Sequence, residues 1–552
     1  MEILNVENMS FRYGGNGKKT LYNINLNIRE GEFVVLCGHS GSGKTTLLRL
    51  LKKEIAPYGE LEGEIYCEGK KQTELSGTES MKFSGYVMQN PETQIITDTV
   101  RYELAFALEN MGCGRDEVNR KTAEICNIFG ISEWIDKKTY NLSGGQKQLL
   151  NLASVMITEP KVLLLDEPGA YLDPKSRINF YDTVKRLNRE SGVTVIIAEH
   201  HLEGLLETAD KLGIMESGRL TDFGEVRQVL ERCDAGNVIQ GFPAFVRIWK
   251  GLGSRGKCPL SVPEARSGLM SDIKRTEVNK EVLKEPKRET TVLAAEHIYF
   301  RYEKNQPDIL TDLSLKLNQG EVFCLVGGNA SGKSTLLRVL SDIKKPYTGK
   351  VIFKNKNIRS YGSSIHKQGI TLLPQNPLHA FICDRISDDY TQVCRSMGYT
   401  DDCAAELTEK LTAETGTKEL VDKNPNDLSG GELQKCALCK ALLTKPKVLL
   451  LDEPDKGIDA CAKKQITELL RKTAENGTAV LVVTHDLEFA SEVADKCGIL
   501  FGGRIEGESE VGDFFLSGRL FTTETVKTAR GIVSGAYRAE QVTEAVKKHG
   551  TE

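Results

Sequence analysis

The sequence predicts an α/β fold made of two tandem copies of one domain, each with a mostly parallel sheet at its core and a helical subdomain. Several short motifs of the first half return in the same order, at a nearly constant spacing, in the second half. Apolar runs such as "EFVVLC", "VLLLD" and "TVIIAE" have the length and composition of buried parallel strands. In each half a glycine-rich loop follows such a run and precedes a helical pattern, which places chemically active loops at strand ends.

The repeat divides the 552 residues into four segments. We expect a first domain over 1–225, a linker over 226–291, a second domain over 292–510 and a C-terminal helical tail over 511–552. Within the linker, the stretch "KRTEVNKEVLKEPKRET" is rich in both charges and poor in apolar residues, which is typical of a solvated connection. The tail has helical spacing. Packing against the second copy is favoured for it over a role as a docking helix for a partner.

Composition narrows the class of protein. Charged residues make up 27% of the chain and the formal net charge is −4, so no basic surface for nucleic acid is expected. The sequence contains no apolar run of about 18 residues, the length that would span a bilayer. The N-terminus "MEILNVENMS" lacks the pattern of a secretory signal. The 14 cysteines follow no disulfide framework, which favours a reducing compartment.

Two loops, "GHSGSGKTT" and "GGNASGKST", match the pattern G-x-x-x-x-G-K-[ST]. Glycines let backbone N–H groups approach a polyphosphate closely, while the lysine meets the β- and γ-phosphates and the next hydroxyl meets Mg²⁺. A chance glycine-rich turn is the alternative, and the second copy makes it improbable. The predicted nucleotide-binding residues are Gly38, Ser40, Gly41, Gly43, Lys44, Thr45 and Thr46 in the first loop, and Gly327, Asn329, Ala330, Gly332, Lys333, Ser334 and Thr335 in the second.

Each copy also ends the strand "VLLLD" in an acid that is followed by a second acid. We expect Asp166 and Asp452 to help hold Mg²⁺, together with Thr45 in the first copy and Ser334 in the second. Glu167 and Glu453 are the candidates to orient and polarise a water for attack on the γ-phosphate. Helix-capping acids before a proline are the alternative, and the upstream phosphate loops count against it.

Two further pairs recur at the ends of apolar runs. His200 and His485 follow "TVIIAE" and "AVLVVT", and their repetition favours a catalytic role over a structural one. Gln89 and Gln375 precede an Asn-Pro turn and are placed to contact water or the metal ion.

The motif "LSGG" supplies a second anion-binding loop in each copy, at Ser143 and Gly145 and again at Ser429 and Gly431. Because each copy already has its own phosphate loop, the economical arrangement is face to face. In that arrangement "LSGG" of one copy covers the nucleotide held by the other, so the sequence predicts intramolecular pairing of the two domains.

Together these motif sets resemble the P-loop nucleotide-binding domains of ABC ATPases, over about four-fifths of the chain. The resemblance implies an enzyme that hydrolyses ATP with Mg²⁺, and it implies that Tyr13 and Tyr302 stack on adenine. Three positions depart from the family pattern: Ala330 replaces a glycine, Glu432 replaces a glutamine, and Glu199 stands where threonine often precedes the histidine.

The stretch "VMQNPETQIITDTVRYELAFALEN" is similar to the Q-loop region of energy-coupling factor ATPases. That resemblance implies a peripheral subunit at the cytoplasmic face of the cell membrane, powering import of a vitamin, a vitamin precursor or a metal ion. Its partners would be a transmembrane coupling protein and a substrate-binding membrane subunit. Ile95, Ile96, Phe381 and Ile382 are the expected contacts with the coupling protein, unless they pack into their own helical subdomain.

Two other readings compete with this one. The first is the tandem ATPase of a sugar or nucleoside importer, against which the "NPETQ" stretch argues. The second is a soluble ABC translation factor that acts on ribosomes. Such factors carry a long charged helical hairpin between the copies, whereas this linker contains several prolines and the chain is not basic.

Overall fold

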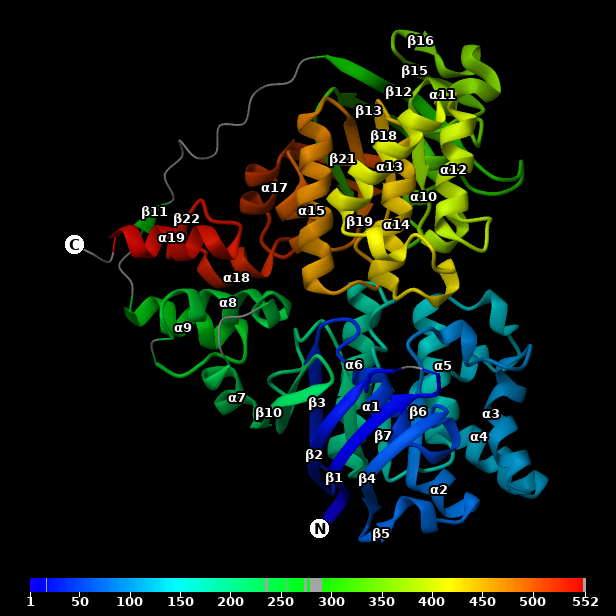
Figure 1. Cartoon of the computed structure of the whole chain (residues 1–552), viewed down its shortest axis with the longest axis vertical. Coiled ribbons are helices and arrows are strands. Elements are labelled where there is room, and N and C mark those ends of the chain that lie inside the picture. Colours follow the sequence, from blue (N-terminus) through cyan, green and yellow to red (C-terminus); the bar gives the residue numbers. More distant parts are fainter. Residues whose placement is uncertain (16, 234–236, 255, 273–275, 278–289, 550–552) are drawn as a thin grey trace. The chain divides into compact units, whose positions relative to one another are not determined.

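The computed structural model describes residues 1–552 apart from 16, 234–236, 255, 273–275, 278–289 and 550–552. The chain divides into two compact units, Met1–Ala265 and Arg266–Glu552 (Figure 1). Each unit contains a six-stranded, mostly parallel sheet and a four-stranded antiparallel sheet, together with helices. The predicted α/β fold in two tandem copies is confirmed.

The first unit is assembled from these elements. Its strands are β1 (Glu2–Tyr13), β2 (Leu21–Arg29), β3 (Phe33–Gly38), β4 (Gly59–Cys67), β5 (Lys70–Lys71), β6 (Ser84–Val87), β7 (Val162–Asp166), β8 (Thr194–Ala198), β9 (Lys211–Glu216) and β10 (Arg219–Glu225). Its helices are α1 (Lys44–Leu50), α2 (Gly77–Phe83), α3 (Val100–Asn110), α4 (Arg115–Phe129), α5 (Gly144–Met156), α6 (Pro174–Ser191), α7 (Val226–Arg232) and α8 (Ala244–Gly251). The helix α9 (Val262–Asp272) runs across the point at which the units divide.

The large sheet of the first unit has the order β10-β9-β3-β8-β7-β6, with β10 antiparallel to β9 and the remaining pairs parallel. Successive residues of its strands face opposite sides. Val34 and Leu36 join a core with α1 and the antiparallel sheet, whereas Val35 and Cys37 join a core with α3 to α6. Both faces are therefore buried, which explains why these strands are continuous apolar runs.

The second unit repeats this plan. Its strands are β11 (Thr276–Glu277), β12 (Thr291–Phe300), β13 (Leu310–Asn318), β14 (Val322–Val326), β15 (Thr348–Phe353), β16 (Lys356–Asn357), β17 (Ile370–Leu373), β18 (Val448–Asp452), β19 (Ala479–Thr484), β20 (Lys496–Phe501), β21 (Arg504–Glu510) and β22 (Val533–Ser534). Its helices are α10 (Lys333–Leu340), α11 (Ile365–Gln368), α12 (Ile386–Ser396), α13 (Asp401–Thr415), α14 (Gly430–Leu443), α15 (Ala460–Glu475), α16 (Leu487–Val493), α17 (Val511–Ser517), α18 (Glu524–Ala529) and α19 (Ala539–His549). The large sheet has the order β17-β18-β19-β14-β20-β21.

The segments outside the repeat pack against their own units. Phe242, Phe245 and Trp249 join the apolar core of the first unit, although the segment 226–291 was expected to be a linker. The reason is that α8 is amphipathic and buries its apolar side. Most of the charged stretch expected to be a solvated connection lies outside the described residues. In the tail, Phe515 and Val526 join the core of the second unit.

Among the residues that the structure describes, no helix combines the length and the apolar composition needed to cross a membrane. In each unit, three neighbouring parallel strands carry predicted site residues. In the first unit β8 lies between β3 and β7, and in the second unit β19 lies between β14 and β18. Their carboxyl ends therefore meet at one edge of each sheet, and the motifs that follow them converge there.

Candidate active sites

The two glycine-rich loops connect a central strand to a helix in each unit. The first lies between β3 and α1, where Gly41 and Gly43 have φ values of 77° and 100°. The second lies between β14 and α10, where Ala330 and Gly332 have φ values of 59° and 101°. Because these values lie in the left-handed region, the turn is built for glycine, and Ala330 adopts it with a side chain attached.

The lysine of each loop is buried and folds back over its own loop. Lys44 Nζ donates hydrogen bonds to the carbonyl oxygens of Gly38 and His39, at 2.8 and 3.0 Å. Lys333 Nζ donates to the carbonyls of Gly327 and Gly328, both at 2.9 Å. A buried ammonium group held against the mouth of a glycine loop is a suitable partner for phosphate oxygens.

A tyrosine is fixed beside each loop. The hydroxyl groups of Tyr13 and Thr46 lie 3.0 Å apart, and those of Tyr302 and Thr335 lie 3.2 Å apart. These contacts place an aromatic ring next to the phosphate loop in both units, which is where a stacked base would be needed.

The strand-end aspartates lie directly beneath the loops. Thr45 Oγ1 donates to Asp166 Oδ1 at 2.9 Å, and the hydroxyl of Tyr86 donates to Asp166 Oδ2 at 2.8 Å. Burial, followed by the neighbouring Glu167 carboxylate, raises the pKa of Asp166. In the second unit, Asp452 Oδ1 is buried without a hydrogen-bond partner. Carboxylate and hydroxyl oxygens in such positions fit a Mg²⁺ ion that takes its other ligands from phosphate and water.

Glu167 is the centre of a polar cluster in the first unit. Its Oε1 lies 2.7 Å from His200 Nε2 and 3.5 Å from Lys44 Nζ, and its Oε2 accepts a hydrogen bond from Gln89 Nε2 at 2.9 Å. Burial alone would raise the pKa of Glu167, but the charges and hydrogen bonds of His200 and Lys44 outweigh it and hold the pKa below its usual value. An ionised carboxylate of this kind can accept a hydrogen bond from water.

Glu453 has the matching cluster in the second unit, with one addition. Its Oε1 lies 3.3 Å from His485 Nδ1 and 4.0 Å from Lys333 Nζ, and its Oε2 accepts a hydrogen bond from Gln375 Nε2 at 2.5 Å. The additional contact is Lys456, whose Nζ lies 3.2 Å from the same Oε2. Burial opposes ionisation, but His485 and Lys456 lower the pKa of Glu453 below its usual value. Sequence reasoning did not single out Lys456, although its position three residues after Glu453 was visible.

Both glutamates have left-handed backbones, with φ values of 45° at Glu167 and 49° at Glu453. The Glu167 N–H donates to the carbonyl of Ala198 at 2.9 Å, and the Glu453 N–H donates to that of Val483 at 2.8 Å. Non-glycine residues in this conformation cost roughly 1–3 kcal/mol each and cluster at functional sites. Motif spacing and periodicity do not reveal this strain.

A second buried acid lies close to each cluster. In the first unit, Glu199 accepts hydrogen bonds from the N–H of Gly169 at 2.7 Å and from the N–H of His200 at 3.1 Å. Burial raises the pKa of Glu199. In the second unit the buried acid is Asp455, where burial, followed by the charge of Asp486, raises the pKa to about 6.

The "LSGG" serines are helix caps within their own units. Ser143 forms a capping box with Gln146 at the start of α5, and Ser429 forms one with Glu432 at the start of α14. In the first unit, close packing also requires a glycine at position 145, the second glycine of the motif. A Cβ at Gly145 would lie 2.7 Å from Ser176 Oγ. The caps hold each serine and the helix N-terminus in a fixed geometry.

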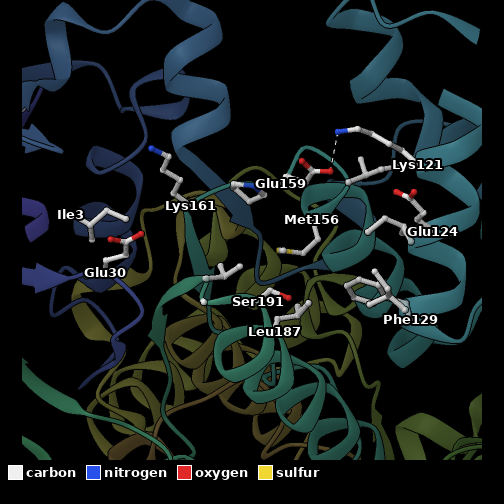
Figure 2. Close-up of a pocket in the computed structure, with 16 residues that line it drawn as sticks. Ile3, Glu30, Lys121, Glu124, Phe129, Met156, Glu159, Lys161, Leu187 and Ser191 are labelled. Atoms are coloured by element: carbon white, nitrogen blue, oxygen red, sulfur yellow. Dashed lines mark hydrogen bonds and ion pairs between the residues drawn. The ribbon is translucent and has the colours of Figure 1, made fainter. Parts of the chain in front are cut away.

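A separate pocket of about 390 Å³ lies at the other edge of the first unit's large sheet (Figure 2). Lys161 and Val193, which precede β7 and β8, contribute to its lining, so it faces away from the carboxyl ends of those strands. Two of its lining residues, Lys121 and Glu159, form an ion pair of 3.0 Å. It shares no residue with the cluster around Glu167.

The comparisons with known proteins agree with this geometry. The family described as ABC transporter matches residues 21–170 and 310–456. A Bacillus cereus protein named "Putative ABC transporter ATP-binding protein" is 37% identical over 544 residues, covering 98% of this chain and 97% of its own. A Bacillus subtilis protein named "Putative HMP/thiamine import ATP-binding protein YkoD" is 30% identical over 504 residues, covering 90% of each chain.

A solved structure of an archaeal ribosome recycling factor, in complex with a ribosomal stalk protein, has a TM-score of 0.58 at 20% identity. The match covers 92% of this chain and 91% of that chain, and at this identity it shows the fold alone. The family match and the Bacillus relatives show the family as well as the fold. This chain belongs to the ABC transporter family, and it is an ATPase with two nucleotide-binding domains fused in one polypeptide.

Proposed function

We propose that this ATPase is the subunit that powers an energy-coupling factor importer for a vitamin, a vitamin precursor or a metal ion. It would work at the cytoplasmic face of the cell membrane, bound to a transmembrane coupling protein and a substrate-binding membrane subunit. The Bacillus subtilis relative, which carries a thiamine-related import name, supports the substrate class. The observation that carries the proposal is the pair of rigid loops with exposed isoleucines that follow Gln89 and Gln375.

In the first unit this loop is held from inside. Glu103 Oε2 accepts hydrogen bonds from the N–H groups of Ile96 and Thr97, at 3.1 and 2.7 Å. Gln94 ties the same loop to β6, because its Nε2 donates to the Tyr86 carbonyl at 3.1 Å. Ile96 remains 68% exposed, whereas Ile95 packs against the core. A fixed loop with one protruding apolar side chain is suited to a preformed partner groove.

The second unit presents the corresponding loop in the same way. Asp389 accepts hydrogen bonds from the N–H groups of Ile382 and Cys383, at 3.2 and 3.0 Å, and Ile382 is 83% exposed. Phe381 is half-buried against its own core, with the ammonium of Lys440 over its ring. The expectation that Ile95 and Phe381 face the partner is therefore corrected. In each pair of neighbouring apolar residues, the first faces inward and only the second protrudes.

The binding roles follow the geometry of each cluster. ATP would lie along the glycine loops with its base near Tyr13 or Tyr302. A bound Mg²⁺ would supply positive charge to the phosphate oxygens, and the residues that would hold it are Thr45, Asp166 and Gln89 in the first unit and Ser334, Asp452 and Gln375 in the second. Glu167 and Glu453 would accept a hydrogen bond from the attacking water, while His200 and His485 keep these carboxylates in place. The products are ADP and phosphate.

We further propose that the two domains pair within one chain, so that Ser143 faces the nucleotide held by Lys333 and Ser429 faces the nucleotide held by Lys44. Cysteine replacements at Ser143 and Ser331 test this pairing with a short cross-linker. Cross-linking should increase when ATP is added and should be lost with ADP. Equal cross-linking with and without ATP would contradict an ATP-closed clamp.

The transport proposal is tested with the double variant Ile96→Asp/Ile382→Asp. Purified from its native membrane, the wild-type chain should bring down a small membrane protein, and the variant should lose that partner while still binding ATP. Leu520→Asp is the matched control, because Leu520 is exposed in the tail, outside both loops. Recovery of ribosomes instead of a membrane protein would support the translation-factor alternative and overturn the proposal.

A further inference from the structure

Among the residues that the structure describes, the hydrolytic centre of the second unit holds a lysine on the turn after its glutamate, where the first unit has an alanine. Lys456 is only 16% exposed at its side chain and Glu453 4%, with 3.2 Å between Nζ and Oε2. The matching position in the first unit is Ala170, because the same turn closes there. The Ala170 N–H donates to the Glu167 carbonyl at 3.1 Å, and the Lys456 N–H donates to the Glu453 carbonyl at 3.2 Å.

The difference falls on one carboxylate oxygen. In the first unit, Glu167 Oε2 accepts a hydrogen bond from Gln89, and Ala170 brings only a methyl group to the turn. In the second unit, Glu453 Oε2 accepts a hydrogen bond from Gln375 and also faces the ammonium of Lys456. A charge-assisted contact is roughly twice as strong as a neutral hydrogen bond. A water molecule therefore binds this oxygen less strongly in the second unit than in the first.

Binding of ATP would not remove this difference. The loop lysines Lys44 and Lys333 lie on the Oε1 side of their glutamates. With ATP bound, their ammonium groups would contact phosphate oxygens instead. Lys456 approaches the opposite oxygen, and because it belongs to the same backbone turn as Glu453 its side chain starts within reach of that oxygen whether or not nucleotide is bound.

We propose that Lys456 makes the second unit the slower of the two hydrolytic sites, because its ammonium partly neutralises the Glu453 carboxylate and so weakens the hydrogen bond that this carboxylate can offer to the attacking water. This inference rests on the proposed role of Glu167 and Glu453. It assigns the two units different duties: the first unit turns over quickly, and the second holds its ATP for longer.

The test follows each unit separately in the intact chain. A photoreactive azido-ATP is bound, hydrolysis is started with Mg²⁺, and the reaction is quenched and cross-linked at intervals. The denatured chain is then cut at a specific protease site inserted in the charged stretch 274–289, and ADP and ATP are counted on each half. In the wild type, the first unit should convert its ATP roughly threefold to tenfold faster than the second, as expected for a weakened general base.

Matched variants identify the cause. Lys456→Ala should remove the difference, Lys456→Arg should keep it, and Ala170→Lys should slow the first unit by a similar factor. Lys472→Ala, which removes an exposed lysine paired with Glu414 in the same unit, should leave both rates unchanged. Binding of a fluorescent ATP analogue without Mg²⁺ should stay within about twofold in all of them, because the proposed effect is on turnover and not on affinity.

Two results would overturn the inference. If Lys456→Ala slows the second unit, the cation assists the reaction. If Lys456→Ala and Lys456→Gln, which keeps much of the side chain's length, both leave its rate unchanged, the contact has no kinetic role. If instead Glu453 is not the residue that polarises the water, the Glu453→Gln variant would still convert ATP to ADP in the second half. This outcome distinguishes a wrong assignment of Glu453 from a wrong role for Lys456.

Discussion

The two units carry the same motifs but surround their glutamates differently. Glu167 has a histidine nitrogen at 2.7 Å and an alanine on its turn, whereas Glu453 has its histidine at 3.3 Å and a lysine on its turn. Both keep the glutamine and the loop lysine. The motif spacing shared by the two units therefore determines which side chains contact each glutamate. The residues between the motifs determine the electrostatic environment of that glutamate.

The buried acid beside each cluster also differs between the units, although both units have one. The first unit supplies its acid from the end of β8, as Glu199, and has Gly169 on the facing turn. The second unit supplies its acid from the turn, as Asp455, and has Thr484 at the strand end. A Cβ at Gly169 would lie 2.7 Å from Glu199 Oε1, so the first unit has room for an acid on one side only. The copies have exchanged the side from which the acid comes.

The largest expected effect comes from the glutamates themselves. The double variant Glu167→Gln/Glu453→Gln should bind ATP and lose steady-state turnover by roughly 100-fold or more, the usual contribution of a positioned base. Glu167→Gln alone should cost more turnover than Glu453→Gln alone, because the first unit is the faster site. Phosphate release measured at saturating ATP gives both answers. Unchanged turnover in the double variant would refute the assignment.

The acid exchange is tested by transplanting it. Gly169→Asp should destabilise the first unit by roughly 3 kcal/mol, since the new side chain clashes with Glu199 and with the hydroxyl of Tyr181, 2.3 Å from the added Cβ. Glu199→Thr should cost roughly 2 kcal/mol, because the buried Gly169 N–H loses its acceptor.

The triple variant Gly169→Asp/Tyr181→Thr/Glu199→Thr carries the second unit's residues at all three positions. The counterpart of Tyr181 is Thr467, eight residues after Asp459 as Tyr181 is after Asp173. Tyr181→Thr alone removes a buried ring and should also destabilise the first unit. The triple variant should lose at most half of the sum of the three separate losses, because its side chains are matched to one another. Urea unfolding measures the triple variant and its three single substitutions. Simple addition of the separate costs would mean that the two arrangements are unrelated.

A pH dependence distinguishes the second unit. The pKa of Asp455 is raised to about 6 in the folded chain, from 3.8, so the unfolded state releases its proton first. Stability should therefore fall as pH rises from about 4 to about 6 and should stay lower above that range. Asp455→Asn should remove this fall and stabilise the second unit at pH 8 by roughly 3 kcal/mol. Calorimetry at pH 5 and pH 8 tests it, with the exposed Glu468→Gln as a control that should change neither.

Much of each site could be predicted from the sequence, because the glycine loop, the paired acids and the histidine all follow parallel strands. Asp166, Glu167 and His200 follow apolar runs, and the carboxyl ends of parallel strands meet at one edge of a sheet. Pairing of Gln89 with Glu167 was less accessible, since it joins residues of two different loops. The sequence indicated that the glutamine would lie near the metal site but not which atom it would contact.

Other features depend on local geometry that periodicity does not encode. Phe381 and Ile382 are both apolar, and which of them faces inward follows from the local backbone, with the 3-10 turn at Pro377–Ala380 before them and the Asp389 hydrogen bonds to the N–H groups of Ile382 and Cys383 after it. Trp249 lies in a segment that mixes proline, glycine and apolar residues and was assigned to the linker, yet α8 buries one side against the first unit. In both cases burial overrides a composition signal that is weak over a few residues.

The smallest expected difference lies in the phosphate loops, where Gly41 of the first unit corresponds to Ala330 of the second. Both backbones are left-handed, at φ 77° and 59°, and a Cβ added at Gly41 would meet nothing within 4 Å. Conformation alone therefore decides the cost. Gly41→Ala should destabilise its unit by about 1 kcal/mol and Ala330→Gly should stabilise its unit by up to that amount, since alanine is strained at positive φ. Denaturant midpoints without nucleotide measure both changes. Effects of the same sign would show that contacts outside the backbone turn control these positions.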